Sequence, residues 1–115
     1  MTYDFTIIPG TSGTVQHPSG LALRYKDSAG GIIDLSSATL HFVANDGSKT
    51  VLGVASPTIT WDSGTGEIVV PISVADTREI GKHLYAKYGL EYRSGDQQRI
   101  IIDGKINSKS VPNAD

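Results

Sequence analysis

Short runs in which apolar and polar residues alternate recur along the chain, and turn-forming residues separate them. The clearest run is EIVVPISV, residues 67–74, in which one face carries Ile68, Val70, Ile72 and Val74. A period of two residues is the period of a β-strand that buries one of its faces. About seven or eight such runs follow one another at intervals of roughly eight to twelve residues, which is typical of a β-sandwich. The pattern therefore predicts an all-β fold.

The remaining predicted strands lie on both sides of this run. They cover residues 2–8, 21–26, 38–44, 58–61, 83–94 and 98–108, with an extended segment at residues 32–35 and a weaker candidate at residues 49–54. Run 83–94 is the longest, and its core face carries Leu84, Ala86, Tyr88, Leu90 and Tyr92. In the last run we expect Ile100, Ile102 and Ile106 to point inward.

One short helix is expected between the run 67–74 and the run 83–94. Ser73 or Val74 would open it, Asp76 lies where a carboxylate in the first turn helps, and Gly81 would close it. Pro71 has no N–H group, so the strand before the helix needs an unpaired side or a bulge at that residue. These signals limit the helix to one or two turns.

The elements together predict a single immunoglobulin-like β-sandwich with one short helix, formed by residues 1–107. Residues 1–19 would supply an N-terminal arm and a loop, and residues 108–115 a flexible C-terminal tail. The chain has 115 residues, thirteen glycines and five prolines, which suits one domain with many turns.

Composition narrows the possible partners. The chain has no cysteine, so disulfides and thiolate metal sites are excluded. The formal net charge is -2 and no basic stripe is present, so we expect no nucleic-acid partner. No apolar run is long enough to cross a bilayer, and the N-terminus has no signal-peptide pattern, so we expect no membrane partner.

No pattern of catalytic or metal-binding residues stands out. The three histidines, His17, His41 and His83, do not have the spacing of metal ligands, and most aspartates fall at turns or caps. No Gly-x-Ser-x-Gly motif is present. We therefore expect no metal, no cofactor and no enzymatic activity, and a hydrolase is the least favoured class.

Two segments carry a family resemblance. LRYKDSAGGIIDLSSATLHFVANDG and GEIVVPISVADTREIGKHLYAKYGLEYRSGDQQRIIIDGKI combine a glycine turn, an IDLS segment, an ADT-type helix and a tyrosine-rich strand. In this order they resemble small tail and baseplate-associated proteins of tailed bacteriophages, and they are similar to the immunoglobulin-like N-terminal module of phage baseplate upper proteins. The resemblance covers about residues 20–107 and rests on the order and spacing of these sequence patterns. The chain departs from it over residues 1–19 and at Ala38.

The resemblance implies a non-enzymatic structural component of the virion. Such a protein would be an adaptor in the tail, baseplate or fibre-attachment region, made in the host cytoplasm and present in several copies in a symmetric assembly. Its partners would be other virion proteins. The alternative is a carbohydrate-binding module, which the same fold supports and for which Trp61 is the only tryptophan available.

Five residues are candidates for partner binding. Tyr3, Phe5 and Ile7 share one face of the first predicted strand, and this arm could pair with a neighbour's sheet or complete its own. Tyr85 and Lys87 share the outer face of a later strand, where a tyrosine could contact a partner or be ordinary surface. Our hypothesis is that the arm or the tail mediates attachment more than the sandwich faces do.

Overall fold

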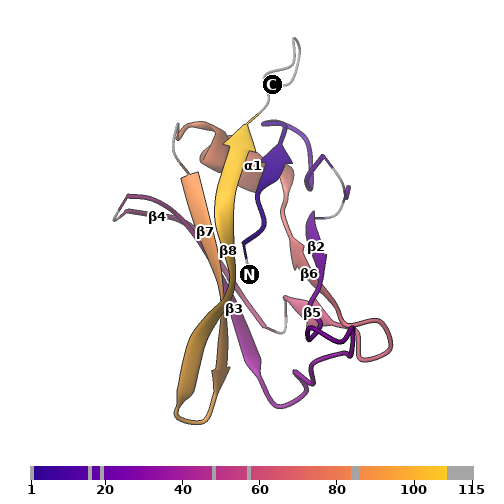
Figure 1. Ribbon diagram of the computed structural model, residues 1–115. Coiled ribbons are helices and arrows are strands. Elements are labelled where there is room, and N and C mark those ends of the chain that lie inside the picture. The colour runs from indigo at the N-terminus through magenta and orange to yellow at the C-terminus, as the bar shows by residue number, and fades with distance from the viewer. Residues whose placement is uncertain are drawn as a thin grey trace.

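The computed structural model describes residues 2–15, 17–18, 20–47, 49–56, 58–83 and 86–108. Leu84, Tyr85 and most of the predicted tail, residues 109–115, lie outside this part. Within it the fold is all-β with one short helix, as the alternating pattern predicts (Figure 1). The elements are β1 (Phe5–Ile7), β2 (Gly20–Arg24), β3 (Thr39–Asp46), β4 (Lys49–Ala55), β5 (Thr60–Trp61), β6 (Glu67–Pro71), α1 (Val74–Gly81), β7 (Ala86–Ser94) and β8 (Gln97–Ser108). The extended segment expected at residues 32–35 forms no strand, because Ile32 makes only an isolated bridge to Lys26 across the glycine turn.

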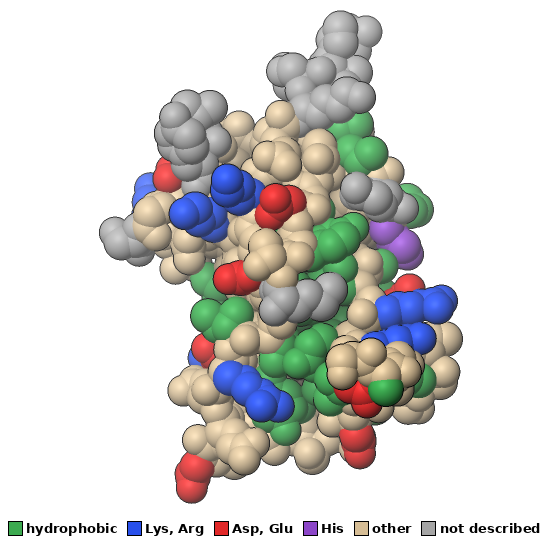
Figure 2. Space-filling model, viewed as in Figure 1, with side chains coloured by type: hydrophobic (Ala, Val, Ile, Leu, Met, Phe, Trp, Pro, Cys, Tyr) green, Lys and Arg blue, Asp and Glu red, His purple; other side chains and the backbone are tan. Residues whose placement is uncertain are grey.

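The strands form two sheets. One has five strands in the order β1-β8-β7-β3-β4, and the other has three in the order β2-β6-β5. Their inner faces bury one apolar core, whose largest members include Phe5, Phe42, Leu21, Ile72 and Leu90. Figure 2 shows hydrophobic side chains running down the middle of one side of the molecule, between the two sheets of Figure 1. The sheets thus meet as the layers of a sandwich.

Helix α1 forms where the sequence predicts it. Ser73 is the N-cap: its hydroxyl accepts a hydrogen bond from the Asp76 N–H (3.1 Å), and its own N–H donates to the Asp76 carboxylate (2.9 Å). This reciprocal capping satisfies two backbone donors at the start of the helix. The inward position predicted for Val74 is wrong, because Val74 is the first residue of the helix and is 37% exposed.

Pro71 explains where β6 stops. It is the last residue of β6 and lies opposite Gly20 of β2. On the other side, β5 pairs only with Ile68 and Val69, so nothing there requires the N–H that proline lacks. The expected unpaired side is present.

The inward position predicted for Ile100 is wrong. Leu90 pairs with Ile102, but the next residue of β7, Glu91, pairs with Ile100, so Ile101 is an extra residue. A β-bulge of this kind shifts the alternation by one residue. Ile101 and Ile102 are buried, whereas Ile100 is 63% exposed on the outer face of the sheet.

The N-terminal strand completes its own sheet. Strand β1 runs parallel to β8, with Phe5 opposite Ile106 and Ile7 opposite Ser108. The short β1 and the long β8 lie side by side in Figure 1, so segments from the two ends of the chain form one layer. Of the two alternatives for the arm, the structure has the one in which the strand pairs at home.

No helix in the described part of the chain is long and apolar enough to span a membrane.

Candidate functional site

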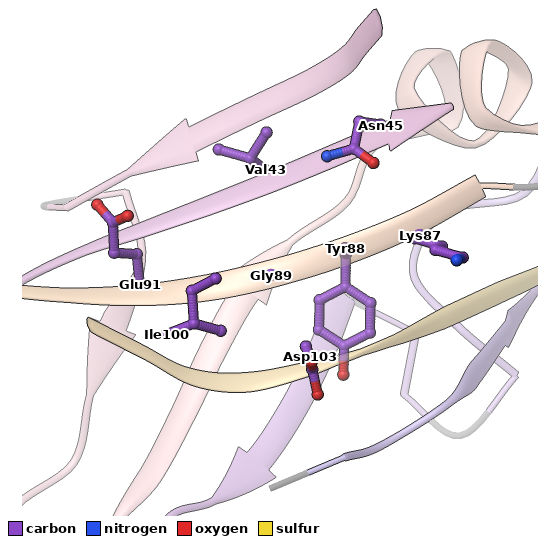
Figure 3. Close-up of a pocket in the computed structure, with 8 residues that line it drawn as sticks. All are labelled: Val43, Asn45, Lys87, Tyr88, Gly89, Glu91, Ile100 and Asp103. Carbon is purple, nitrogen blue, oxygen red and sulfur yellow. The ribbon is translucent and has the colours of Figure 1, made fainter. Parts of the chain in front are cut away.

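The outer face of the five-stranded sheet carries a shallow hollow, which we call the outer trough. It holds about 250 Å³ and is lined by Val43, Asn45, Lys87, Tyr88, Gly89, Glu91, Ile100 and Asp103. Figure 3 shows that these residues come from β3, β7 and β8, with Lys87 and Glu91 at opposite ends and Gly89 between them. The outer trough is thus built on central strands, which position side chains more rigidly than loops.

Gly89 opens the outer trough. It pairs with Val43 on one side and Asp103 on the other, in the middle of the sheet. A Cβ added there would meet only the Ile100 side chain, at an ordinary contact distance of 3.8 Å. The fold therefore does not need glycine here for space, although glycine inside a strand costs about 0.5–1 kcal/mol relative to alanine. A glycine in such a place often marks where another group approaches the backbone closely.

Two apolar side chains border the outer trough. Val43 is 37% exposed, and Ile100 lies close enough to Gly89 to face its open position. Strand β3 directs Val43 outward because its neighbours Phe42 and Ala44 are buried. The bulge in β8 turns Ile100 to the same face. The trough therefore offers apolar surface to a partner without an enclosed cavity.

The carboxylate at the acidic end of the outer trough is already paired with a cation of its own sheet. The Glu91 carboxylate accepts hydrogen bonds from Arg93 Nε and from Gln98 Nε2, the latter at 3.3 Å. The hydrogen bond from Arg93 holds the pKa of Glu91 below its ordinary value. Glu91 is therefore charged at neutral pH and held in place beside the hollow.

The basic end has two lysines that face each other. Lys87 of β7 lies directly opposite Lys105 of β8, and both are exposed. Like charges opposite each other on one sheet face repel. Within the described residues neither lysine makes an ion pair, and both line a second hollow of about 430 Å³ together with Asp4 and Asp103. The two ammonium groups are available to a carboxylate from a partner, although Asp4 and Asp103 already offset part of their charge.

Tyr88 lines the outer trough, while its ring packs into the core on the inner side of the sheet. Its ring is buried against Phe5 (ring centroids 5.0 Å apart) and Phe42 (5.3 Å), and its hydroxyl donates to the backbone oxygen of Tyr3. Burial raises the pKa of the Tyr88 phenol, and the nearby charge of Asp4 adds to this. The phenol therefore stays protonated and structural under physiological conditions.

The predicted partner-binding residues fall in different places. Phe5 and Ile7 are buried in the home core and are not accessible while β1 is in its sheet. Tyr3 is half-buried and gives its backbone to Asp103 and Tyr88. Lys87 lies on the exposed outer face and lines the outer trough, whereas Tyr85 lies outside the described residues. The structure therefore brings only Lys87 into this candidate site.

The metal and carbohydrate alternatives depend on the histidines, the acidic residues and Trp61. Among the described residues no three or more His, Asp or Glu side chains come together, and His83 instead pairs with Asp46 at 2.9 Å. Trp61 is half-buried against the core, and its Nε1 has no hydrogen-bond partner within the described part of the chain. Only part of the ring is therefore exposed to a ligand such as the sugar of the carbohydrate alternative.

Of the residues that line the two hollows, sequence reasoning identified only Lys87 as a site residue, and those it missed include Val43, Gly89, Ile100 and Lys105. The glycine that interrupts the run 83–94 was a usable signal, because an isolated glycine in a strand suggests a close approach. Ile100 gave no such signal, since the bulge that exposes it is a property of strand pairing.

No known protein-family model matches this chain, and no curated protein matches its sequence.

Proposed function

We propose that the chain is a non-enzymatic structural adaptor of a tailed-phage virion, and that it holds a neighbouring tail, baseplate or fibre-attachment protein on the outer face of its five-stranded sheet. The observation that supports a docking role is Gly89, a glycine in a central strand that neither space nor a left-handed backbone requires. The phage context rests on the resemblance of residues 20–107.

The chemistry of the outer trough defines what such a partner would present. An apolar side chain would enter above Gly89, between Val43 and Ile100, and an acidic side chain would reach Lys87 and Lys105. Filling the hollow gains apolar burial, and the carboxylate relieves the repulsion between the two lysines. Repetition of this contact through a symmetric virion would convert weak binding into firm attachment.

Incorporation into particles tests the proposal. The substitution Gly89→Val fills the outer trough with a side chain that favours strands, so the isolated protein should remain as stable as the original. We expect purified particles of the virus that encodes the chain to contain several-fold less of this variant, measured by quantitative immunoblot.

The matched control is Thr39→Val, which changes an exposed residue at the far end of β3 on the same sheet. It should be incorporated normally. Equal incorporation of both variants would exclude the outer trough as the docking surface, and absence of the original chain from particles would refute the adaptor role itself.

A further inference from the structure

Strands β1 and β4 form the two edges of the five-stranded sheet, and the chain covers β1 itself. Strand β1 has three residues, and the Val15 N–H donates to the backbone oxygen of Thr6 at its centre (2.9 Å). The loop that follows β1 thus folds back along its outer edge and occupies the backbone oxygen of Thr6. An edge covered in this way cannot pair with another chain.

Strand β4 has a longer edge and no second neighbouring strand in the described part of the chain. The Ser56 N–H donates to the oxygen of Leu40 in β3 (2.9 Å), and the Leu40 N–H donates to the Ser56 hydroxyl (3.0 Å), so the N–H of Ser56 faces β3. Because facing and averted residues alternate along an antiparallel strand, Gly53 directs its N–H and C=O away from β3. Gly53 is exposed, and an added Cβ there would meet no atom within 4 Å.

The side chains of β4 do nothing to prevent pairing. Its sequence, KTVLGVA, carries one charge, Lys49 at its first residue, and no proline. Edge strands are usually protected by several charges, prolines or a cover. Helix α1 approaches β4 at the Lys49 end, where the charge of Lys49 contributes to the lowered pKa of Glu79. The end that contains Gly53 therefore remains the open part of the edge.

We propose that β4 pairs antiparallel with β4 of a second copy of this chain, about a two-fold axis at Gly53. The antiparallel direction keeps the Lys49 side chains at opposite ends, whereas a parallel pair would place them side by side. The register brings Leu52 beside Val54 of the second copy. Both side chains already pack partly against their own core, so the apolar inner layer becomes continuous between the two copies.

Charge selects a second copy over an unrelated extended peptide. Residues 50–55 are uncharged, so they give a charged peptide no partner, but they match themselves without conflict. At the axis, two glycines face each other and no side chain obstructs the backbones. Pairing of the two edges removes from solvent the backbone groups that each copy leaves unpaired.

The molecular mass in solution tests the dimer. We expect light scattering to give about twice the chain mass at high concentration, falling towards the monomer on dilution. Gly53→Pro removes the outward N–H without removing a bond to β3, so this variant should keep its circular dichroism spectrum and become monomeric. Gly53→Ala keeps the N–H and should remain dimeric.

Cross-linking tests the register, because the chain has no cysteine of its own. Residues facing across a hydrogen-bonded antiparallel pair have Cα atoms about 5.5 Å apart, within reach of a short bifunctional thiol reagent. Gly53→Cys should therefore form a covalent dimer with such a reagent at low concentration, whereas Asp96→Cys, at the β7–β8 turn, should not. If Gly53→Pro does not fold, this pair of variants decides the question.

Two outcomes would overturn the proposal: a monomer at every concentration, or a dimer that persists in Gly53→Pro. A second protein on the same edge would also appear as a monomer in these measurements of the isolated chain. The result is independent of the outer trough, since Gly89→Val should leave the mass of the dimer unchanged.

Discussion

Strands β1 and β4 are both edges of the five-stranded sheet, but the rest of the chain covers one of them and not the other. Just before β1, the Tyr3 N–H donates to the backbone oxygen of Asp103 in β8 (2.8 Å). The two segments lie so close that a Cβ on Gly104 would be 2.1 Å from the Tyr3 oxygen. Beside β4, an equivalent atom on Gly53 would touch nothing. One edge is packed by its own chain, whereas the other is open.

This contrast separates residues that the fold needs from residues that it leaves free. The buried polar group Thr77 serves the covered edge: its oxygen accepts from the Gly10 N–H (3.2 Å), and its hydroxyl lies 2.8 Å from the Thr11 oxygen. Those contacts fix the loop that covers β1. The hypothesis that the N-terminal arm is the attachment element therefore requires β1 to leave a site to which several contacts bind it.

Core truncation at the two edges should give the largest difference in stability. Phe5→Ala in β1 removes a fully buried ring and should lower the free energy of unfolding by about 3–5 kcal/mol. Leu52→Ala in β4 removes a half-buried side chain and should cost roughly 1 kcal/mol. Urea unfolding of both variants at one protein concentration measures the difference. Equal losses would mean that β1 is no better integrated than β4.

Loss of one hydroxyl should have the next largest effect. Thr77→Val keeps the volume but leaves the Gly10 N–H without its acceptor, so we expect a loss of about 1–3 kcal/mol. The control, Thr50→Val, changes an exposed threonine on β4 and should stay within about 0.5 kcal/mol. Hydrogen exchange adds a local readout, because the Val15 amide should lose protection only in Thr77→Val.

Removal of the Tyr88 hydroxyl should cost less, about 0.5–1.5 kcal/mol for the lost hydrogen bond to Tyr3. Its pH dependence identifies the cause. The folded-state pKa is raised above the ordinary 10.0, so the unfolded chain releases this proton first. The stabilisation is present below pH 10 and declines as pH rises above it.

Tyr88→Phe should therefore remove part of the alkaline loss of stability that the original protein shows above pH 10. Unfolding curves at several pH values, together with ultraviolet titration of the tyrosines, measure both effects. An identical pH profile for the two proteins would show that Tyr88 ionises normally in the folded state.

The sequence predicts the inner face of this fold well and its outer face poorly. Alternation identifies Ile68, Val70 and Ile72 as core, because a period of two is a local property of each strand. The bulge at Ile101 is different, since it depends on how β7 and β8 pair and reverses the expected orientation of Ile100. Pairing of β1 with β8 joins residues about a hundred positions apart, which no local pattern encodes.

The candidate surface was hidden for the same reason. Lys87 was identified from the outer face of its own strand, but its neighbour Lys105 becomes visible only once the register of β7 and β8 is known. Likewise, Gly53 only weakens the strand prediction for residues 49–54 when the sequence is considered alone. Its role at an exposed edge becomes visible once the sheet order is known. Local sequence therefore identified Lys87 as an outward residue, whereas strand pairing and strand order determined which residues lie beside it.

The smallest expected effect is also the most direct test of the open edge. If the home fold does not need glycine at position 53, then Gly53→Ala should stabilise the protein by up to about 0.5–1 kcal/mol, because alanine loses less backbone entropy on folding. The control is Gly47→Ala, in the turn before β4. Both sites are exposed with no atom near an added Cβ, but Gly47 has a φ of 62°, which strains any other residue. This control should lose about 1–2 kcal/mol.

Thermal unfolding at matched protein concentration, well below that at which dimers form, compares the two. A loss in Gly53→Ala as large as in Gly47→Ala would mean that the home fold requires glycine in β4. The glycine would then no longer distinguish the open edge from the covered one.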